Sequence, residues 1–214
     1  MNRSEDKWFQ IGSETYMIKA IIFDLGGVLF TNGTGQFIDR LVARYNLDRD
    51  QVKNVIDGGI GTLYREAKIS RDEFWKKAIE SLGIVADADT LEEDWIRGYE
   101  LIQGTKDLIV ELTKQYKIYY LSDNVKERVE KLNERYDFLR WFAGGIFSHE
   151  VGVRKPDPRL YRLILDKAKV LAQEALYIDD KPRNLEPARD MGMATILFES
   201  PEKILQQVKE KLMR

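Results

Sequence analysis

The sequence predicts an α/β protein in which a doubly wound parallel sheet is interrupted by an all-helical insertion. From residue 99 onward, short apolar segments alternate with helical periodicity, which favours parallel strands, right-handed crossovers and helices on both faces. Between residues 32 and 98, only helical spacing occurs. We therefore expect a core of residues 17–31 and 99–214, a helical domain of residues 32–98 and an N-terminal extension of residues 1–16. That polar, aperiodic extension could be native, an upstream start or a cloning remnant.

The composition is that of a globular protein with a sizeable core, because 43% of the 214 residues are hydrophobic and 33% are charged. The formal net charge of −2 and the lack of a long basic run argue against a nucleic acid partner. The absence of cysteine excludes disulfides and thiolate chemistry. Without a stretch of about 18 apolar residues or a signal-peptide core, we expect a cytoplasmic protein with no membrane partner. The sequence does not indicate the oligomeric state.

The apolar segment from Met17 to Phe23, interrupted by one lysine, predicts the first buried strand. Asp24 follows directly and would lie at the carboxyl end of that strand, where open α/β sheets form their ligand crevices. Gly26 and Gly27 let the backbone turn there and approach a ligand closely. Taken alone, Asp24 would be better explained as a residue that caps a turn.

Within the insertion, apolar residues share one face on each of two predicted helices: Phe37, Leu41, Val42 and Tyr45 on the first, and Phe74, Trp75, Ala78, Ile79 and Leu82 on the second. Ser70 is the expected N-cap of the second helix, and Glu73 completes a capping box. Gly83 is its expected end.

After the insertion, strands and helices alternate to the C-terminus. Asp157 is the expected N-cap of a helix that has Pro158 at its first position, and Thr105 is the expected cap of the first of these helices. The predicted strands are residues 117–121, 145–148, 175–178 and 194–198. The predicted helices are residues 105–116, 125–136 and 158–169, one that includes 187–191, and one from about 202 to 213.

Polar clusters follow four of the predicted strands at their carboxyl ends. These clusters are Asp24; Ser122, Asp123 and Asn124; Lys155; and Asp179 and Asp180 with Asn184. Each has an ordinary structural alternative, namely a turn or cap residue for the carboxylates, a helix N-cap for Ser122 and a solvated side chain for Lys155. Four such clusters on one edge of one sheet are harder to explain by structure alone, so we expect a ligand site there.

The motifs Asp24-Leu25-Gly26-Gly27-Val28-Leu29, Leu121-Ser122-Asp123, Arg154-Lys155-Pro156-Asp157-Pro158 and Ile178-Asp179-Asp180-Lys181-Pro182-Arg183-Asn184 resemble, in order and spacing, those of the haloacid dehalogenase-like superfamily. The insertion resembles the branch with a helical cap after the first motif. The residues of the first motif are similar to those of the Asp-Leu-Gly group, which includes sugar-phosphate phosphatases. The resemblance implies a Rossmann-like sheet whose first strand is central, between the second and fourth.

The resemblance also implies a Mg²⁺-dependent phosphatase. Asp24 would be the nucleophile that forms an aspartyl-phosphate. Asp24, Asp180 and the backbone carbonyl of Gly26 would hold Mg²⁺, which prefers oxygen ligands. Asp179 and Asn184 would bind the ion through water or anchor its ligands.

The phosphoryl group of a small phosphorylated substrate would be bound by residues from three motifs. Ser122, Asp123 and the backbone amides after Ser122 lie where a strand leads into a helix, and helix N-termini bind phosphate. Lys155 would neutralise charge on the phosphoryl group and on Asp24. Gly26 and Gly27 would allow close approach of the backbone.

Gly26 departs from the phosphatase pattern, because most phosphatases of this kind carry a second Asp there to protonate the leaving group. General acid–base assistance is typically worth about 10²–10⁴ in rate. Its loss favours substrates with good leaving groups, such as anomeric sugar phosphates. His149, the only histidine, could replace the missing proton donor or could be an ordinary loop residue.

In the insertion, Tyr64 and Arg65 follow the glycine-rich residues 58–61 and are candidates to contact substrate from above, although a flexible helix connection explains the glycines equally well. Two alternatives to a phosphatase remain. A haloacid dehalogenase uses the same nucleophile on carbon without a metal, and Asp179-Asp180 speaks against it. A phosphate- or partner-binding module without turnover is suggested only by Gly26.

Overall fold

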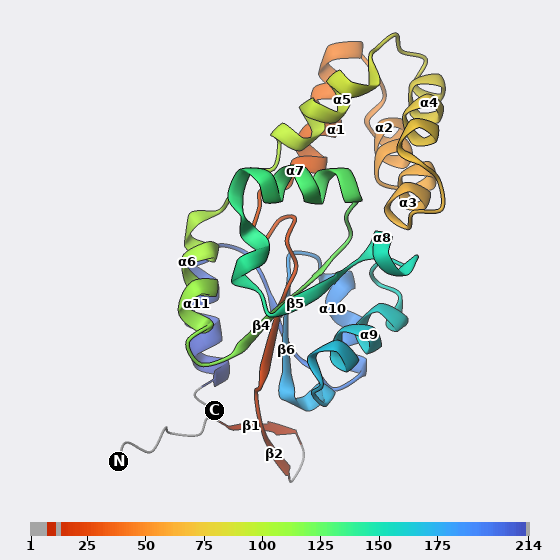
Figure 1. Ribbon diagram of the computed structural model, residues 1–214. Coiled ribbons are helices and arrows are strands. Elements are labelled where there is room, and N and C mark those ends of the chain that lie inside the picture. Colours follow the sequence, from red (N-terminus) through yellow and green to blue (C-terminus); the bar gives the residue numbers. More distant parts are fainter. Residues whose placement is uncertain (1–7, 12–13, 213–214) are drawn as a thin grey trace.

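The computed structural model describes residues 8–11 and 14–212. Five parallel strands form the central sheet in the order β5-β4-β3-β6-β7 (Figure 1). Their bounds are β3 Ala20–Phe23, β4 Lys117–Ser122, β5 Gly144–Phe147, β6 Ala175–Asp179 and β7 Ala194–Leu197. In the central register, Phe23 lies between Tyr120 and Ile178, so the predicted position of the first strand between the second and fourth is confirmed.

The sheet is doubly wound because alternate residues of its central strand enter two different hydrophobic clusters. Ile21 and Phe23 pack with α6, α7 and α11, whereas Ala20 and Ile22 pack with α9 and α10. The bounds of the core helices are α6 Gln103–Leu112, α7 Lys126–Tyr136, α8 Ser148–Val151, α9 Pro158–Ala168, α10 Pro182–Asp190 and α11 Pro201–Leu212. Two short 3₁₀ helices cover Phe138–Trp141 and Ala172–Glu174. No helix within the described residues is long and apolar enough to span a bilayer.

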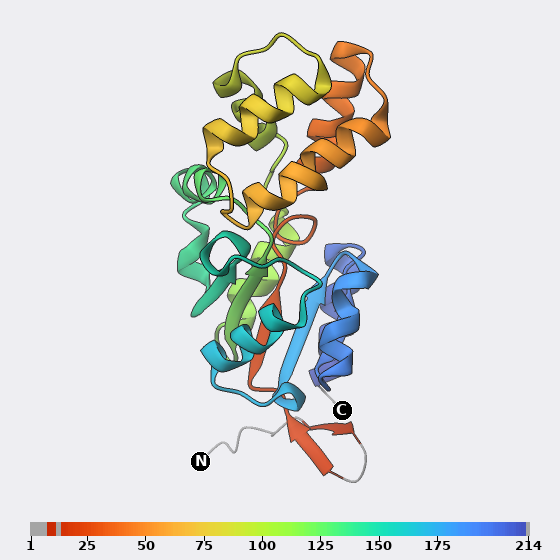
Figure 2. The same cartoon turned by 90° about the vertical axis from the view of Figure 1, so that its right-hand side faces the viewer.

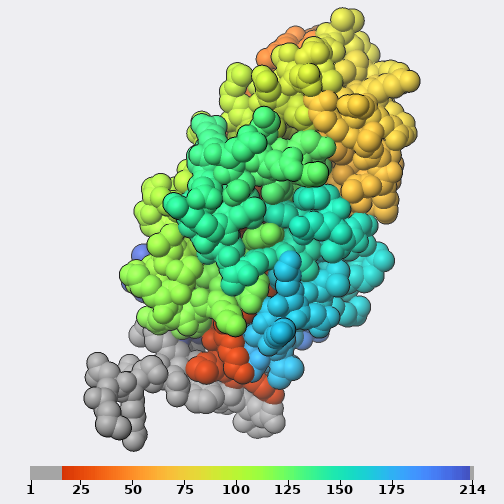
Figure 3. All heavy atoms as spheres, in the orientation of Figure 1, coloured from red at the N-terminus to blue at the C-terminus, as the bar shows by residue number. Residues whose placement is uncertain are grey.

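The insertion forms five helices that lie above the carboxyl edge of the sheet (Figures 1 and 2). Their bounds are α1 Gly33–Tyr45, α2 Arg49–Ile56, α3 Gly59–Arg65, α4 Arg71–Leu82 and α5 Ala88–Arg97. Their core is aromatic: the Phe37 ring stacks on Trp95 at a centroid distance of 5.2 Å and meets Trp75 edge-on at 6.1 Å. The space-filling view shows the insertion resting directly on core helices α7 and α8 (Figure 3).

The predicted helix ends of α4 are confirmed. The Ser70 side chain accepts a hydrogen bond from the Glu73 amide at 3.2 Å, and Gly83 ends the helix in the left-handed conformation with φ +62°. The Asp157 side chain likewise accepts from the Arg159 amide at 2.9 Å, as expected for the N-cap of α9.

The chain crosses between core and insertion twice, and the two crossings lie side by side. Thr31 Oγ1 donates to the Gly98 carbonyl at 2.6 Å and accepts from the Glu100 amide at 2.9 Å. The Thr31 amide donates to the Glu100 carbonyl at 2.9 Å, and the Ile102 amide donates to the Leu29 carbonyl at 2.8 Å. The two connections therefore form one hydrogen-bonded ribbon.

Several element boundaries differ from the sequence prediction, most by one residue and some by more. An antiparallel hairpin, β1 Trp8–Ile11 and β2 Glu14–Met17, lies within the segment that we expected to be aperiodic. Met17 belongs to β2 of this hairpin, where it pairs with Trp8, so the central strand begins only at Ala20. The helix expected from Thr105 begins at Gln103. It begins there because the preceding residue, Ile102, is still hydrogen-bonded to Leu29 in the ribbon. The helix containing residues 187–191 begins earlier, with Pro182 at its first position.

Candidate active site

Three carboxylates meet at the carboxyl ends of β3 and β6. Asp24, Asp179 and Asp180 each offer an oxygen within 4.8 Å of the other two. The parallel pairing explains this, because the Asp24 amide continues the β3–β6 ladder by donating to the Ile178 carbonyl at 2.8 Å. Asp24 and Asp179 are buried. Three carboxylates this close and this poorly hydrated require compensating positive charge.

Lys155 supplies part of that charge. Its Nζ lies 2.8 Å from Asp24 Oδ1 and 2.8 Å from Asp179 Oδ2, and the side chain is only 2% exposed. Burial disfavours the charged form of Lys155, but the two carboxylates outweigh burial and raise its pKa above the ordinary value. Lys155 is therefore a permanently charged group held at the centre of the carboxylate cluster.

Asp179 is saturated with hydrogen bonds. Besides Lys155, it accepts from the Lys181 amide at 2.8 Å, from Asn184 Nδ2 at 2.9 and 3.1 Å, and from the Tyr177 hydroxyl. Burial raises its pKa, yet these partners outweigh burial and hold the pKa below 3.8. Of the two roles expected for Asp179 and Asn184, these contacts favour anchoring of the site over direct binding of an ion.

Asp180 is different, because its Oδ1 is buried and has no hydrogen-bond partner. Burial raises the pKa of Asp180. Burial also raises the pKa of Asp24, to about 7; Lys155 opposes this rise, and the neighbouring carboxylates Asp179 and Asp180 add to it. Asp24 Oδ1 accepts from the Leu25 amide at 2.7 Å as well as from Lys155. An unpaired buried carboxylate oxygen facing further carboxylates fits a hard divalent cation, so the donor set is compatible with the expected Mg²⁺.

The loop after Asp24 is shaped by Gly27. Its φ of +92° lies in the left-handed region, and a Cβ on Gly27 would lie 2.4 Å from Asp180 Oδ2. The Leu25 carbonyl accepts from the Leu29 amide at 2.9 Å and from the Phe30 amide at 2.8 Å, which closes the turn. Gly27 thus leaves the space that the Asp180 carboxylate occupies, which is a different role from the predicted contact with substrate.

Above these residues lies a cavity of about 680 Å³ between core and insertion. The predicted site residues that line it are Asp24, Gly26, Ser122, Asp123, Asn124, Lys155, Asn184 and Arg65, whereas Asp179 and Asp180 are not part of its lining. The Asp123 carboxylate positions the loop that carries Lys155, because it accepts from the Lys155 amide at 2.9 Å and from Arg154 Nε at 3.0 Å. The walls formed by the insertion include Thr34 and Ile38.

Tyr64 and Arg65 have different positions, although they are neighbours in α3. Arg65 lines the cavity, and its Nη1 donates to the Ile56 carbonyl at 2.9 Å. Tyr64 does not line the cavity: its ring stacks on Phe74, and its hydroxyl donates to Glu127 of α7 at 3.0 Å. The structure therefore places Arg65, but not Tyr64, at the cavity, because adjacent helical residues point in different directions.

His149 also lies away from the cavity. Its Nδ1 is 2.9 Å from the Asn124 carbonyl oxygen, and its ring stacks on Phe147. Since His149 does not line the cavity, the structure places no histidine where a leaving group could take its proton.

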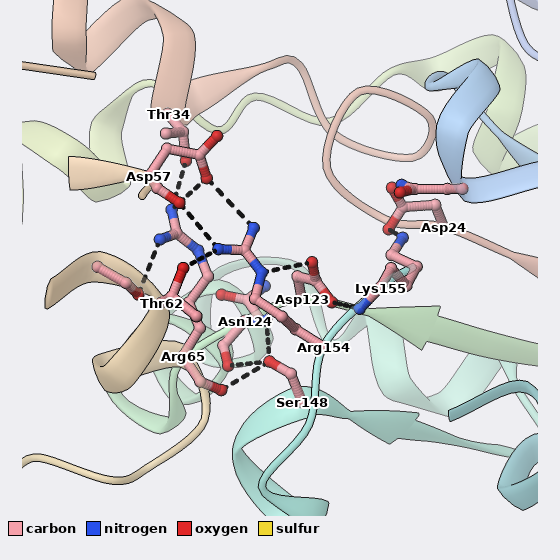
Figure 4. A network of polar contacts seen from close by, with 12 residues as sticks. Asp24, Thr34, Asp57, Thr62, Arg65, Asp123, Asn124, Ser148, Arg154 and Lys155 are labelled. Carbon is pink, nitrogen blue, oxygen red and sulfur yellow. Dashed lines mark hydrogen bonds and ion pairs between the residues drawn. The ribbon is translucent and has the colours of Figure 1, made fainter. Parts of the chain in front are cut away.

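Sequence reasoning missed the contact between Arg154 and the insertion (Figure 4). Arg154 Nη1 donates to the Asp57 carbonyl at 2.8 Å and to Thr62 Oγ1 at 2.9 Å, and Nη2 lies 3.3 Å from Asp57 Oδ1. The same carboxylate lies 3.4 Å from Arg65 Nη2. Arg154 was noticed only as a neighbour of Lys155, and a partner 97 residues away leaves no local signal.

Replacing Gly27 by Ala tests the space reserved for Asp180. We expect Gly27→Ala to keep the fold but to lose the rise in Tm that Mg²⁺ gives the parent, because the new methyl group displaces the carboxylate. Gly83→Ala is the control, since its φ is also positive but nothing lies within 4 Å of the new Cβ. That control should lose about 1–2 kcal/mol of stability and keep its response to Mg²⁺. An unchanged Mg²⁺ response in Gly27→Ala would contradict this assignment.

Asp57→Asn tests the ion pairs between core and insertion. Burial raises the pKa of Asp57, but Arg65 and Arg154 outweigh burial and lower it below 3.8. The ion pairs therefore stabilise the fold fully above the unfolded-state pKa and are lost as pH falls through the lower folded-state pKa. We expect Asp57→Asn to lower the free energy of unfolding by about 2 kcal/mol at pH 7.

The difference between parent and Asp57→Asn should shrink as pH falls below about 4. Urea unfolding at several pH values measures it. Asp39→Asn is the matched control, because its ion pair with Arg49 is more than half exposed on both sides and should contribute less than about 1 kcal/mol. Equal stability of parent and Asp57→Asn at pH 7 would refute the prediction.

Comparisons with known proteins show which family the chain resembles in sequence and in fold. The D-ribitol-5-phosphate phosphatase of Bacteroides thetaiotaomicron is 25% identical over 193 residues, which cover 84% of this chain and 91% of that protein. The crystal structure of a HAD family enzyme from the same species, in complex with magnesium and inorganic phosphate, has a TM-score of 0.71 at 19% identity and covers 86% of this chain and 95% of that chain.

The L-2-haloacid dehalogenase from Xanthobacter autotrophicus, with chloropropionic acid covalently bound, has a TM-score of 0.63 at 19% identity, over 92% of this chain and 85% of that chain. At these identities, the two solved structures show a shared fold alone. The haloacid dehalogenase-like hydrolase model, in contrast, matches residues 18–192, which is most of the chain. On this match and on the strand order described above, the chain belongs to the haloacid dehalogenase-like hydrolase family.

Proposed function

We propose that this protein is a Mg²⁺-dependent phosphatase that hydrolyses a small phosphorylated metabolite through an aspartyl-phosphate on Asp24. One observation carries the proposal: Lys155 binds Asp24 and Asp179 together, while a buried oxygen of Asp180 beside them has no partner. This arrangement supplies a nucleophile and a fixed cation that line the cavity, and a free ligand oxygen on the carboxylate beside them. The similarity to a ribitol-phosphate phosphatase supports the substrate class.

In the proposed reaction, a carboxylate oxygen of Asp24 attacks phosphorus, and the bond from phosphorus to the leaving oxygen breaks. Lys155 offsets the repulsion between the carboxylate and the phosphoryl dianion. Mg²⁺, held by Asp24 and Asp180, would supply further neutralisation of the phosphoryl oxygens. Water then attacks the aspartyl-phosphate at phosphorus, which releases inorganic phosphate and restores the carboxylate.

The leaving oxygen must gain a proton unless it is stable as an anion. Residue 26 is a glycine instead of the Asp that donates this proton in most related phosphatases. His149, the candidate replacement, contacts the Asn124 carbonyl, so neither position supplies a proton donor. We infer that solvent water provides this proton. Substrates whose leaving group is a weak base are then favoured.

The dehalogenase alternative uses Asp24 as well, but it gives no role to the unpaired oxygen of Asp180. The solved dehalogenase shares only the fold at 19% identity. A binding module without turnover needs no buried lysine directly on the nucleophile. The phosphatase accounts for more of the site than either alternative.

Hydrolysis of p-nitrophenyl phosphate tests the proposal. We expect turnover that requires Mg²⁺, that stops in excess chelator, and that falls at least about 10³-fold in Asp24→Asn because the amide cannot attack phosphorus. Lys76→Gln, an exposed change on the insertion, is the control and should retain activity. Activity that survives chelation would favour metal-independent chemistry, and no turnover in the parent would favour the binding module.

The identity of residue 26 predicts a leaving-group preference. We expect kcat/KM for the anomeric glucose 1-phosphate to exceed that for glucose 6-phosphate at least about tenfold. A Cβ on Gly26 would lie 3.5 Å from the Tyr99 ring, an ordinary contact, so Gly26→Asp can be accommodated there. This variant should raise turnover of glucose 6-phosphate more than that of glucose 1-phosphate. Equal turnover of the two substrates by the parent would contradict the prediction.

A further inference from the structure

The cavity above Asp24 is lined by more positive than negative side chains. Its cations are Arg49, Lys53, Arg65, Arg154, Lys155, Lys181 and Arg183, and its carboxylates are Asp24, Asp57, Asp123 and Glu186. Ion pairs account for four of the cations. Arg49 pairs with Asp39, Arg65 and Arg154 share Asp57, Arg154 also binds Asp123, and Lys155 binds Asp24 and Asp179.

Three lining cations are left over. Within the described part of the chain, the side chains of Lys53, Lys181 and Arg183 form no hydrogen bond or ion pair with another residue. Among the carboxylates that line the cavity, only Glu186 has no ion pair with another described residue. The cavity therefore holds a surplus of positive charge beyond what the phosphoryl-binding Lys155 provides.

The leftover cations come from both sides of the cavity. Lys53 belongs to α2 of the insertion, whereas Arg183 belongs to α10 of the core. Both also line a smaller neighbouring cavity, whose other charged residues are Asp50, Asp57, Arg154 and Lys155, so they lie at the junction of core and insertion. Lys53 and Arg183 are both exposed at this junction, so an anion in the cavity can reach both of them.

The position of Arg183 in its helix strengthens the argument. Lys181 is the N-cap of α10 and Arg183 is in its first turn, where no acidic residue is present. The N-terminus of a helix carries a partial positive charge, which favours anions and disfavours cations. Asp179 is occupied by Lys155, and Asp180 faces the proposed metal ion. Glu186 of the same helix also lines the cavity, but a single carboxylate can balance only one of the three leftover cations.

We propose that Lys53 and Arg183 form a second anion-binding subsite, so that the substrate carries another phosphate or carboxylate besides the phosphoryl group that Asp24 attacks. This inference rests on the proposed function and specifies its substrate class. The second anion bridges core and insertion, because its two cations belong to different parts of the chain. Lys181 adjoins the metal-binding carboxylates and also acts electrostatically on Asp24 and Asp57, so it is left unchanged in the test.

Matched inhibitors of p-nitrophenyl phosphate hydrolysis test the subsite. One pair is glucose 1-phosphate and glucose 1,6-bisphosphate, which adds a phosphate. The other pair is glycerol 3-phosphate and 3-phosphoglycerate, which adds a carboxylate. The inhibition constant of the member with two anionic groups should be lower about tenfold in at least one pair, since two partly screened ion pairs each contribute a few fold.

In Lys53→Gln/Arg183→Gln, the ratio of inhibition constants should fall to about one. Values of kcat/KM for p-nitrophenyl phosphate, which has no second anion, should change less than about twofold. Lys76→Gln removes an exposed charge elsewhere on the insertion and should keep the parental ratio. The pair that shows the larger ratio identifies the second anion as phosphate or carboxylate.

The subsite is refuted if both pairs give a ratio near one in the parent, or if the double variant retains the parental ratio while folded. Circular dichroism and Tm establish that the variant is folded. A parent that does not hydrolyse p-nitrophenyl phosphate refutes the proposed phosphatase instead. The same ratios are then measured as dissociation constants by calorimetry, so the subsite is judged separately.

Discussion

The arrangement of the site depends on one buried lysine held between two carboxylates. Lys155 lies 2.8 Å from both Asp24 and Asp179, and without it two acids would face each other in a nearly water-free space. A charge of this kind is stable only when its partners are fixed in position. The sheet fixes Asp24 and Asp179 through the pairing of β3 with β6, and Asp123 fixes the backbone of Lys155. The most costly charges in the core are thereby confined to the edge where substrate enters.

Charge pairing also joins the insertion to the core. Asp57 of the insertion serves both Arg65 of its own α3 and Arg154 of the core, and Arg154 is in turn bound to Asp123. A continuous set of ion pairs and hydrogen bonds therefore leads from the insertion to the loop of Lys155 (Figure 4). The helices above the cavity do not merely cover it, because their position is tied to the backbone that carries the central cation.

The sequence alone is sufficient to predict that the carboxylates at the ends of β3 and β6 lie close together. A carboxylate at the end of a buried strand is a local pattern, and parallel pairing then brings Asp24 to Asp179 without further information. Contacts across the insertion are not local. Arg154 and Asp57 are 97 residues apart, and the choice between Arg65 and Tyr64 depends on the rotation of α3. The hairpin from Trp8 to Met17 was missed because each of its strands is only four residues long, too short to show a periodic pattern.

The hydrogen-bonded ribbon of Thr31, Gly98 and Glu100 restricts how the five helices can move. Two separate linkers would let the helices twist and slide against the core, whereas two connecting segments that are hydrogen-bonded to each other bend mainly as one unit. The cross-linked connections therefore leave the five helices fewer ways to shift as a body against the sheet than two independent linkers would.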